Sequence, residues 1–99
     1  MGQHDFSQLF GEYPNVIAAM PTDFTAHAFI LELARRHQRL YIEALYTYRN
    51  GSAPFQAVHQ QLAMMLNECP NLVRRNGDEP NSQDIWTNQQ GCSRWQKVR

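Results

Sequence analysis

The sequence is dominated by one uninterrupted stretch, Phe24 to Arg49, which contains neither glycine nor proline and is followed directly by Asn50-Gly51. Such a stretch predicts a long helix that ends at the glycine. At helical spacing two apolar strips run along it, and charge is confined to a narrow band. The first strip contains Ile30, Ala34, His37, Tyr41, Ala44 and Tyr48, and the second contains Ala28, Leu31, Ile42 and Tyr46.

A helix that is apolar on so much of its circumference must be covered by other parts of the chain or by a partner. We therefore expect this helix to be the central element of a small domain. The unbroken 4-3-4-3-4 spacing from Ile30 to Tyr48 favours one continuous helix, and a kink or break near residues 36–38, giving two shorter helices, is the alternative. Thr22-Asp23 offers an N-cap for the helix, and Thr25 is a competing cap.

The charged band of this helix alternates in sign. Glu32 and Arg36 stand four residues apart, as do Arg39 and Glu43, a spacing that allows ion pairs along one helical face. The run ARRHQR (34–39) has the composition of a phosphate-binding segment, but the interleaved glutamates favour a solvated, salt-bridged face.

Length and charge limit the classes of function. Ninety-nine residues allow one domain with a modest core, and nine basic residues balance nine acidic ones. A net charge of zero argues against strongly electrostatic binding of nucleic acid, whose affinity comes largely from phosphate neutralisation. The charge is uneven, however, because residues 1–34 carry four acidic and no basic residues, whereas residues 35–99 carry nine basic and five acidic residues. A neutral total can therefore include a basic face.

The sequence also indicates a cellular location. No stretch approaches the ~18 apolar residues needed to span a bilayer. The N-terminus lacks the basic start and the apolar segment of a signal peptide. We therefore predict a cytoplasmic protein that does not engage a membrane, with Cys69 and Cys92 as reduced thiols.

Residues 1–21 predict an N-terminal packing arm made of short helices, and residues 22–99 predict the domain that it packs on. Gly11 ends the first short helix, and Pro14 begins a second one that Pro21 closes. The apolar side chains of the arm are the natural cover for the second apolar strip of the long helix. They are Phe10, Tyr13, Val16 and Ile17.

Residues 54–69 predict the cleanest amphipathic helix of the chain, with proline in its first turn and Pro70 directly after its end. Met64 falls among the glutamines on the exposed face, where it is a candidate contact residue. The apolar arc of this helix contains Phe55, Val58, Leu62, Met65, Leu66 and Cys69.

The last third of the chain predicts two antiparallel strands, residues 71–75 and 92–98. Asn76-Gly77 indicates a turn directly after the first strand. The segment between the strands is too long for a simple hairpin turn, so we expect Ile85 and Trp86 to pack down, with Trp86 against Trp95. The fold class is therefore mainly α with a small antiparallel β-hairpin, in a single compact unit.

Sequence motifs for catalysis and cofactor binding are not present. We find no GxGxxG, GxxxxGK[ST], HExxH or GxSxG pattern, and no histidine or cysteine pair stands at metal-ligand spacing. A nucleophile–histidine site could still assemble in three dimensions, for example from Cys92 and His59, but the sequence does not single one out. We predict a non-enzymatic protein with no cofactor and no metal, and no small-molecule ligand is evident.

The order of helix, short glycine-containing turn, amphipathic helix and two strands separated by a polar loop resembles a winged helix-turn-helix domain, over roughly Thr25 to Val98. The resemblance implies that the second helix enters the DNA major groove and that the loop touches the backbone. Its amide side chains, which can pair bidentately with adenine, would then face the groove. These are Gln56, Gln60, Gln61 and Asn67. Phosphate contacts would come from Arg74, Arg75, Arg94, Lys97 and Arg99.

Two features of the sequence depart from the pattern of a DNA-binding winged helix and favour a different use of the same scaffold. The second helix has no lysine or arginine, and the loop carries Asp78, Glu79 and Asp84, which would repel phosphate. Winged-helix scaffolds also serve in protein–protein contacts, which need no basic helix. The alternative hypothesis, which the sequence supports about as well as DNA binding, is that the chain is a module that binds another protein or itself. Its candidate surface residues are Leu31, Ile42, Tyr46 and Met64.

Overall fold

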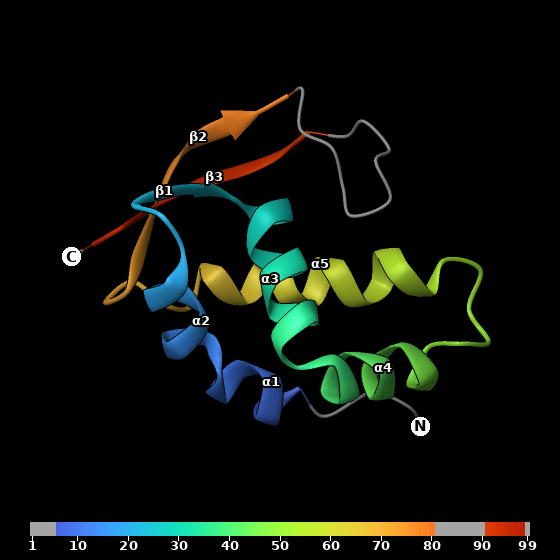
Figure 1. Ribbon diagram of the computed structural model, residues 1–99. Helices are drawn as coiled ribbons and strands as arrows, with labels where there is room; N and C mark the ends of the chain where they lie inside the picture. Colours follow the sequence, from blue (N-terminus) through green and yellow to red (C-terminus); the bar gives the residue numbers. More distant parts are fainter. Residues whose placement is uncertain (1–5, 81–90, 99) are drawn as a thin grey trace.

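The computed structural model describes residues 6–80 and 91–98, in which a helical layer supports a small antiparallel sheet (Figure 1). The mainly α fold class with a small sheet is confirmed. In chain order the elements are α1 (Ser7–Gly11), α2 (Tyr13–Ala19), β1 (Asp23–Thr25), α3 (Ala26–Arg36), α4 (Gln38–Thr47), α5 (Pro54–Leu66), β2 (Val73–Glu79) and β3 (Cys92–Lys97).

The sheet contains a strand that the sequence pattern did not predict. Its order is β1-β3-β2, and β3 pairs antiparallel with both neighbours. Phe24 and Thr25, which were expected in the long helix, belong to β1, because Phe24 is buried opposite Trp95 of β3. The helix begins at Ala26, where the Thr25 hydroxyl accepts a hydrogen bond of 3.1 Å from the Ala28 amide. Of the two predicted caps, Thr25 is therefore the one used.

The long helix is divided at His37, so the prediction of one continuous helix is wrong and its alternative is correct. His37 has φ −130° and ψ 56°, outside the helical region. The Gln38 side chain donates a hydrogen bond of 3.2 Å to the Arg35 carbonyl beside the break. The break lets the two halves pack in different directions: α3 contacts α2 and the sheet, α4 contacts α1, and both contact α5 (Figure 1).

The pairing of the two C-terminal strands is confirmed, but the predicted turn at Asn76-Gly77 is wrong. Strand β2 continues through both residues, and its register with β3 shifts between Arg75 and Asp78. Gly77 has φ +87°, a conformation that glycine adopts without strain. The Asn-Gly pair therefore forms an irregularity within the strand. The predicted packing of Ile85 and Trp86 lies outside the described residues.

The N-terminal helices are part of the core, but they cover a different surface from the one expected. The Tyr13 ring lies edge-on to Phe29 of α3 with centroids 4.7 Å apart, and its hydroxyl donates a 2.6 Å hydrogen bond to the Leu62 carbonyl of α5. The second apolar strip is left uncovered by the described residues, since Ile42 and Tyr46 are 60% and 62% exposed. The prediction that the arm covers this strip is wrong, because the arm packs on Phe29 of α3 through Tyr13 and on Tyr48 beside the end of α4 through Phe6.

The Tyr13 hydroxyl provides a test of this packing. Tyr13→Phe removes the buried hydrogen bond to Leu62, and we expect the free energy of unfolding to fall by about 1 kcal/mol in urea denaturation. Tyr46→Phe, an equivalent change at an exposed ring, is the control and should leave the urea midpoint unchanged. Equal effects of the two substitutions would contradict the role given to Tyr13.

Candidate functional site

The exposed face of α5 is uncharged. Gln56, Gln60, Met64 and Asn67 are exposed and follow one another at helical spacing along the helix, and Gln61 is exposed farther round the circumference. No charged residue occurs between Asn50 and Asn67, so neither α5 nor the turn before it can neutralise a phosphate. Three of the four amides predicted to face DNA therefore lie on α5 and the fourth, Asn67, directly follows its end, without a cation among them.

Two of the arginines predicted to contact phosphate are paired with acids of the same sheet. The Arg75 guanidinium lies 2.6 Å from the Asp78 carboxylate, across the irregular part of β2. The Arg94 guanidinium of β3 lies 3.4 Å from the Glu79 carboxylate of β2. The acids that were expected to repel phosphate thus also neutralise these two arginines.

The remaining described cations of the strands have uncharged partners. Arg74 donates two hydrogen bonds, of 2.8 and 3.0 Å, to the side-chain oxygen of Gln96 on β3. The Lys97 ammonium donates to the carbonyls of Ala18 and Met20 at 3.2 and 3.0 Å, where it ties β3 to the end of α2. Arg99 lies outside the described residues. The sheet therefore presents less free positive charge than its composition indicates.

The charged band of α3 and α4 matches its prediction. Glu32 forms an ion pair with Arg36, and Arg39 lies 3.6 Å from Glu43, in both cases four residues apart. These side chains are largely solvent-exposed, so each pair contributes at most about 1 kcal/mol to stability. The band is a solvated surface rather than an assembled anion site.

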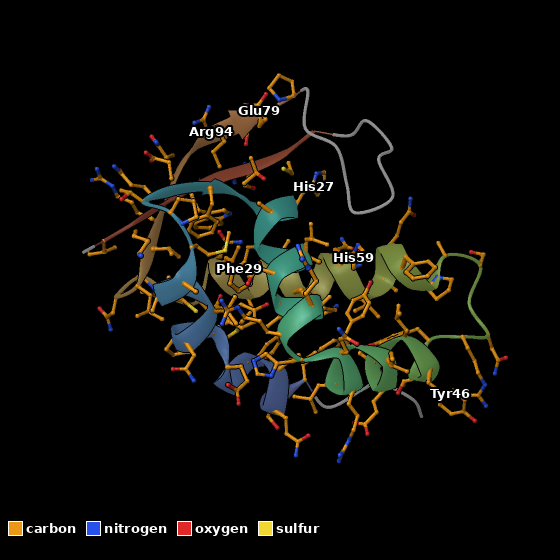
Figure 2. The ribbon with its side chains drawn as sticks, viewed as in Figure 1. His27, Phe29, Tyr46, His59, Glu79 and Arg94 are labelled. Atoms are coloured by element: carbon orange, nitrogen blue, oxygen red, sulfur yellow. The ribbon has the colours of Figure 1, made fainter. Side chains whose placement is uncertain are left out.

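The apolar residues predicted for an interface are only partly brought together. Ile42 and Tyr46 lie one turn apart on the outer side of α4, whereas Leu31 and Met64 are exposed on α3 and α5. Arg49 lies over the Tyr46 ring, with its guanidinium carbon 3.9 Å from the ring centroid, and it also donates to the Tyr46 carbonyl at 2.9 Å. Figure 2 shows Tyr46 on the side of α4 away from the rest of the molecule.

A cleft of about 650 Å³ lies between the start of α3, the first half of α5 and the start of β3. Its described lining contains no aspartate, glutamate, lysine or arginine. The histidines His27 and His59, labelled in Figure 2, line it from α3 and α5. The described lining residues are Ala26, His27, Ile30, Ser52, Ala53, Pro54, Phe55, Gln56, His59, Gln60, Ala63, Gly91, Cys92 and Ser93.

His59 is held in place by α4. Its Nε2 atom forms a 2.6 Å hydrogen bond with the Tyr41 hydroxyl, and the two rings stack with centroids 5.7 Å apart. Burial raises the pKa of Tyr41 to about 12, so this hydroxyl stays protonated at neutral pH. Cys92 and His59, the pair named as a conceivable nucleophile and base, line the same cleft.

The sequence reasoning missed the cleft because its walls come from three elements far apart in the chain. One pattern in the sequence could have indicated it: the uncharged run from Asn50 to Asn67 supplies polar side chains without a single ion. Such a run is unusual for an exposed helix, on which charged residues normally provide solubility.

Within residues 6–80 and 91–98, no three histidine, cysteine, aspartate or glutamate side chains form a group that could hold a metal ion. None of the helices described has both the length and the apolar character needed to cross a membrane.

Comparison with known proteins adds no further assignment. No family model matches the sequence, no curated protein matches it, and no solved structure matches the fold. A function must therefore be derived from the surfaces described above.

The buried tyrosines predict how stability depends on pH. Burial raises the pKa of Tyr41 to about 12 and raises that of Tyr13 further, above the ~10 of an unfolded tyrosine. The folded state therefore holds these protons more tightly, so their contribution is complete below pH 10 and is lost as the pH rises from 10 through 12. We expect the urea midpoint to fall over this range, and to fall less in Tyr41→Phe. An identical pH dependence in that variant would contradict the assignment.

Proposed function

We propose that this chain is a small non-enzymatic, winged-helix-like module that binds a protein partner through the outer face of α4. The element order supports the winged-helix part of the proposal, because α3 and α4 are followed by a glycine-containing turn, α5 and two antiparallel strands. The third strand, β1, completes a sheet of order β1-β3-β2 beside them. The binding surface is defined by Ile42, Tyr46, Arg39, Glu43 and Arg49, and is called the α4 face below.

One observation carries the proposal: two large apolar side chains stand one turn apart on α4, and each is about 60% exposed. Single exposed apolar residues are ordinary, but adjacent ones form a surface that gains from being covered. Burying what is exposed of Ile42 and Tyr46 would contribute on the order of 2 to 3 kcal/mol. Tyrosine and arginine are also enriched at the centres of protein interfaces, and here Arg49 is already stacked on Tyr46.

The charges on the α4 face favour an acidic partner over a second copy of this chain. Arg39 and Arg49 flank the apolar pair, and Glu43 is the one acid among them. Consider an antiparallel contact between two copies in which Ile42 of each copy packs on Tyr46 of the other. Arg39 of each copy would then face Arg49 of the other, because 42/46 and 39/49 are both centred on residue 44. Such a contact sets like charges against each other. A helix with apolar residues flanked by aspartate or glutamate fits the surface instead.

The nucleic-acid hypothesis has weaker support. Arg75 and Arg94 are paired with carboxylates, Lys97 binds main-chain carbonyls, and α5 is uncharged. Binding to phosphate would first have to break these contacts, and their loss would offset the favourable free energy of counterion release. Arg74 is the described strand cation with neither a carboxylate nor a main-chain partner.

Binding to duplex DNA distinguishes the two hypotheses. We expect fluorescence anisotropy with a labelled duplex in low-salt buffer to give at most weak binding, with a slope of log affinity against log salt no steeper than about −0.9, the value for one phosphate. The test includes the double variant Arg74→Ala, Arg75→Ala. Steep salt dependence in the wild type that is lost in this variant would replace our proposal with a nucleic-acid function.

The partner class can be tested with a library of helical peptides displayed against the immobilised full chain. We expect enriched sequences to carry apolar residues four positions apart, flanked by aspartate or glutamate, because these complement Ile42 and Tyr46 and the two arginines. Ile42→Glu with Tyr46→Glu should abolish binding of the selected peptides. Arg39→Glu with Arg49→Glu should instead select basic flanks.

Met64→Glu is the matched control for this selection, since Met64 is an exposed apolar residue on α5 rather than on α4. It should leave binding of the selected peptides within about twofold. Peptides that lack acidic flanks, or that bind the Ile42→Glu, Tyr46→Glu variant as well as the wild type, would rule out the α4 face as the site.

A further inference from the structure

The tripeptide Arg-Asn-Gly occurs twice in the chain, at residues 49–51 and 75–77. Asparagine followed by glycine is prone to spontaneous deamidation, because glycine has no Cβ to hinder the approach of its main-chain nitrogen to the asparagine side chain. The asparagine and the glycine of both copies are solvent-exposed. Since the three residues are identical in the two copies, a difference in their reactivity reports mainly on the folded structure around them.

The first copy is held by a turn. The Gly51 amide donates a 3.0 Å hydrogen bond to the Tyr48 carbonyl, which closes the main chain around Asn50 directly after α4. The Gly51 nitrogen can attack the Asn50 side chain only after it has lost the proton that this hydrogen bond holds. Breaking the bond first slows the reaction by about fivefold, the factor that corresponds to about 1 kcal/mol.

The second copy lies where the pairing of β2 with β3 is interrupted. Neither Asn76 nor Gly77 has a partner residue in the described strand β3, because the register shifts between Arg75 and Asp78. An irregularity of this kind leaves an extra residue unpaired and locally disrupts the hydrogen bonds of the ladder. Gly77 also departs from strand geometry, with φ +87°. The main chain around Asn76 is therefore restrained less than in a regular strand.

We propose that Asn76 is a spontaneous modification site, which deamidates through a succinimide faster than Asn50 does. The Gly77 nitrogen gives up its proton and bonds to Cγ of Asn76, the bond from Cγ to Nδ2 breaks, and ammonia leaves with that proton. Water then opens the ring at either carbonyl, which leaves aspartate or isoaspartate in place of asparagine. The reaction consumes only water, and no group is oxidised or reduced.

The modification changes the charge of the sheet. It adds a carboxylate next in sequence to Arg75, whose guanidinium already lies 2.6 Å from the Asp78 carboxylate. A further negative charge in this segment makes β2 less able to bind phosphate. Asn76 lies on β2, so deamidation there does not alter the residues of the α4 face.

The experiment incubates the full chain in neutral buffer, with one sample folded and a second unfolded in concentrated urea. Digestion with pepsin at low pH, where deamidation is slow, is followed by mass spectrometry that measures conversion of the side-chain amide to a carboxyl group at each asparagine. In urea we expect the rates at Asn50 and Asn76 to agree within about twofold. On folding, the ratio of the Asn76 rate to the Asn50 rate should rise at least about fivefold, the factor set by one hydrogen bond.

Two substitutions identify the reacting residue. Asn76→Gln keeps the amide but requires a six-membered ring, so the fast reaction of the folded chain should disappear. Asn50→Gln is the matched control and should leave the rate at Asn76 within about twofold of the wild-type value. A urea midpoint within error of the wild-type value shows that each variant is folded.

The proposal would be overturned if the ratio of the two rates rose by less than about fivefold on folding, the factor expected from one hydrogen bond. This outcome includes a folded chain in which neither asparagine reacts. Fast deamidation that persists in Asn76→Gln would overturn it as well.

Discussion

The break at His37 is the constraint on which the arrangement of the whole domain depends. A continuous helix would carry both apolar strips along one axis, and no single layer of chain could cover both. With the axis redirected at His37, Phe29 and Leu33 of α3 are buried in the core, while Tyr41 and Ala44 of α4 turn toward α5. The second strip then points away from every described element, so Ile42 and Tyr46 remain in solvent. An exposed apolar pair thus follows from how the core is closed.

Charge is distributed in a way that separates two kinds of surface. Acidic and basic residues pair with each other on the outer band of α3 and α4 and across β2 and β3, at distances up to 3.6 Å. The first half of α5 and the adjoining cleft carry no charge among the residues described. Long-range attraction of a polyanion by the described residues is therefore weak.

The elements with strong local patterns could be predicted. The helix that begins at Pro54, the short helices before Pro21, the i,i+4 ion pairs and the antiparallel pairing of the last two strands all follow from spacing and proline placement. The helix predicted over 54–69 ends earlier than expected, at Leu66. The errors occurred where a tertiary contact outweighed a local preference. Phe24 joins a strand because its ring is buried opposite Trp95, and Asn76-Gly77 stays within β2 because pairing with β3 continues past it.

Local sequence patterns specify most of the helical segments, the uncharged stretch from Asn50 to Asn67 and the ion pairs four residues apart, because these properties depend on neighbours a few positions apart. Three features depend instead on how distant parts of the chain meet: Glu79 neutralises Arg94, the Tyr13 hydroxyl reaches the Leu62 carbonyl, and residues of α3, α5 and β3 line a cleft. These contacts join residues 15 to 67 positions apart, which no local sequence pattern brings together. The segment from Phe24 to Arg49 does lie at the centre of the domain, since α3 contacts α2, α5 and the sheet. It forms part of a strand and two helices instead of one helix, and the division at His37 leaves Ile42 and Tyr46 exposed.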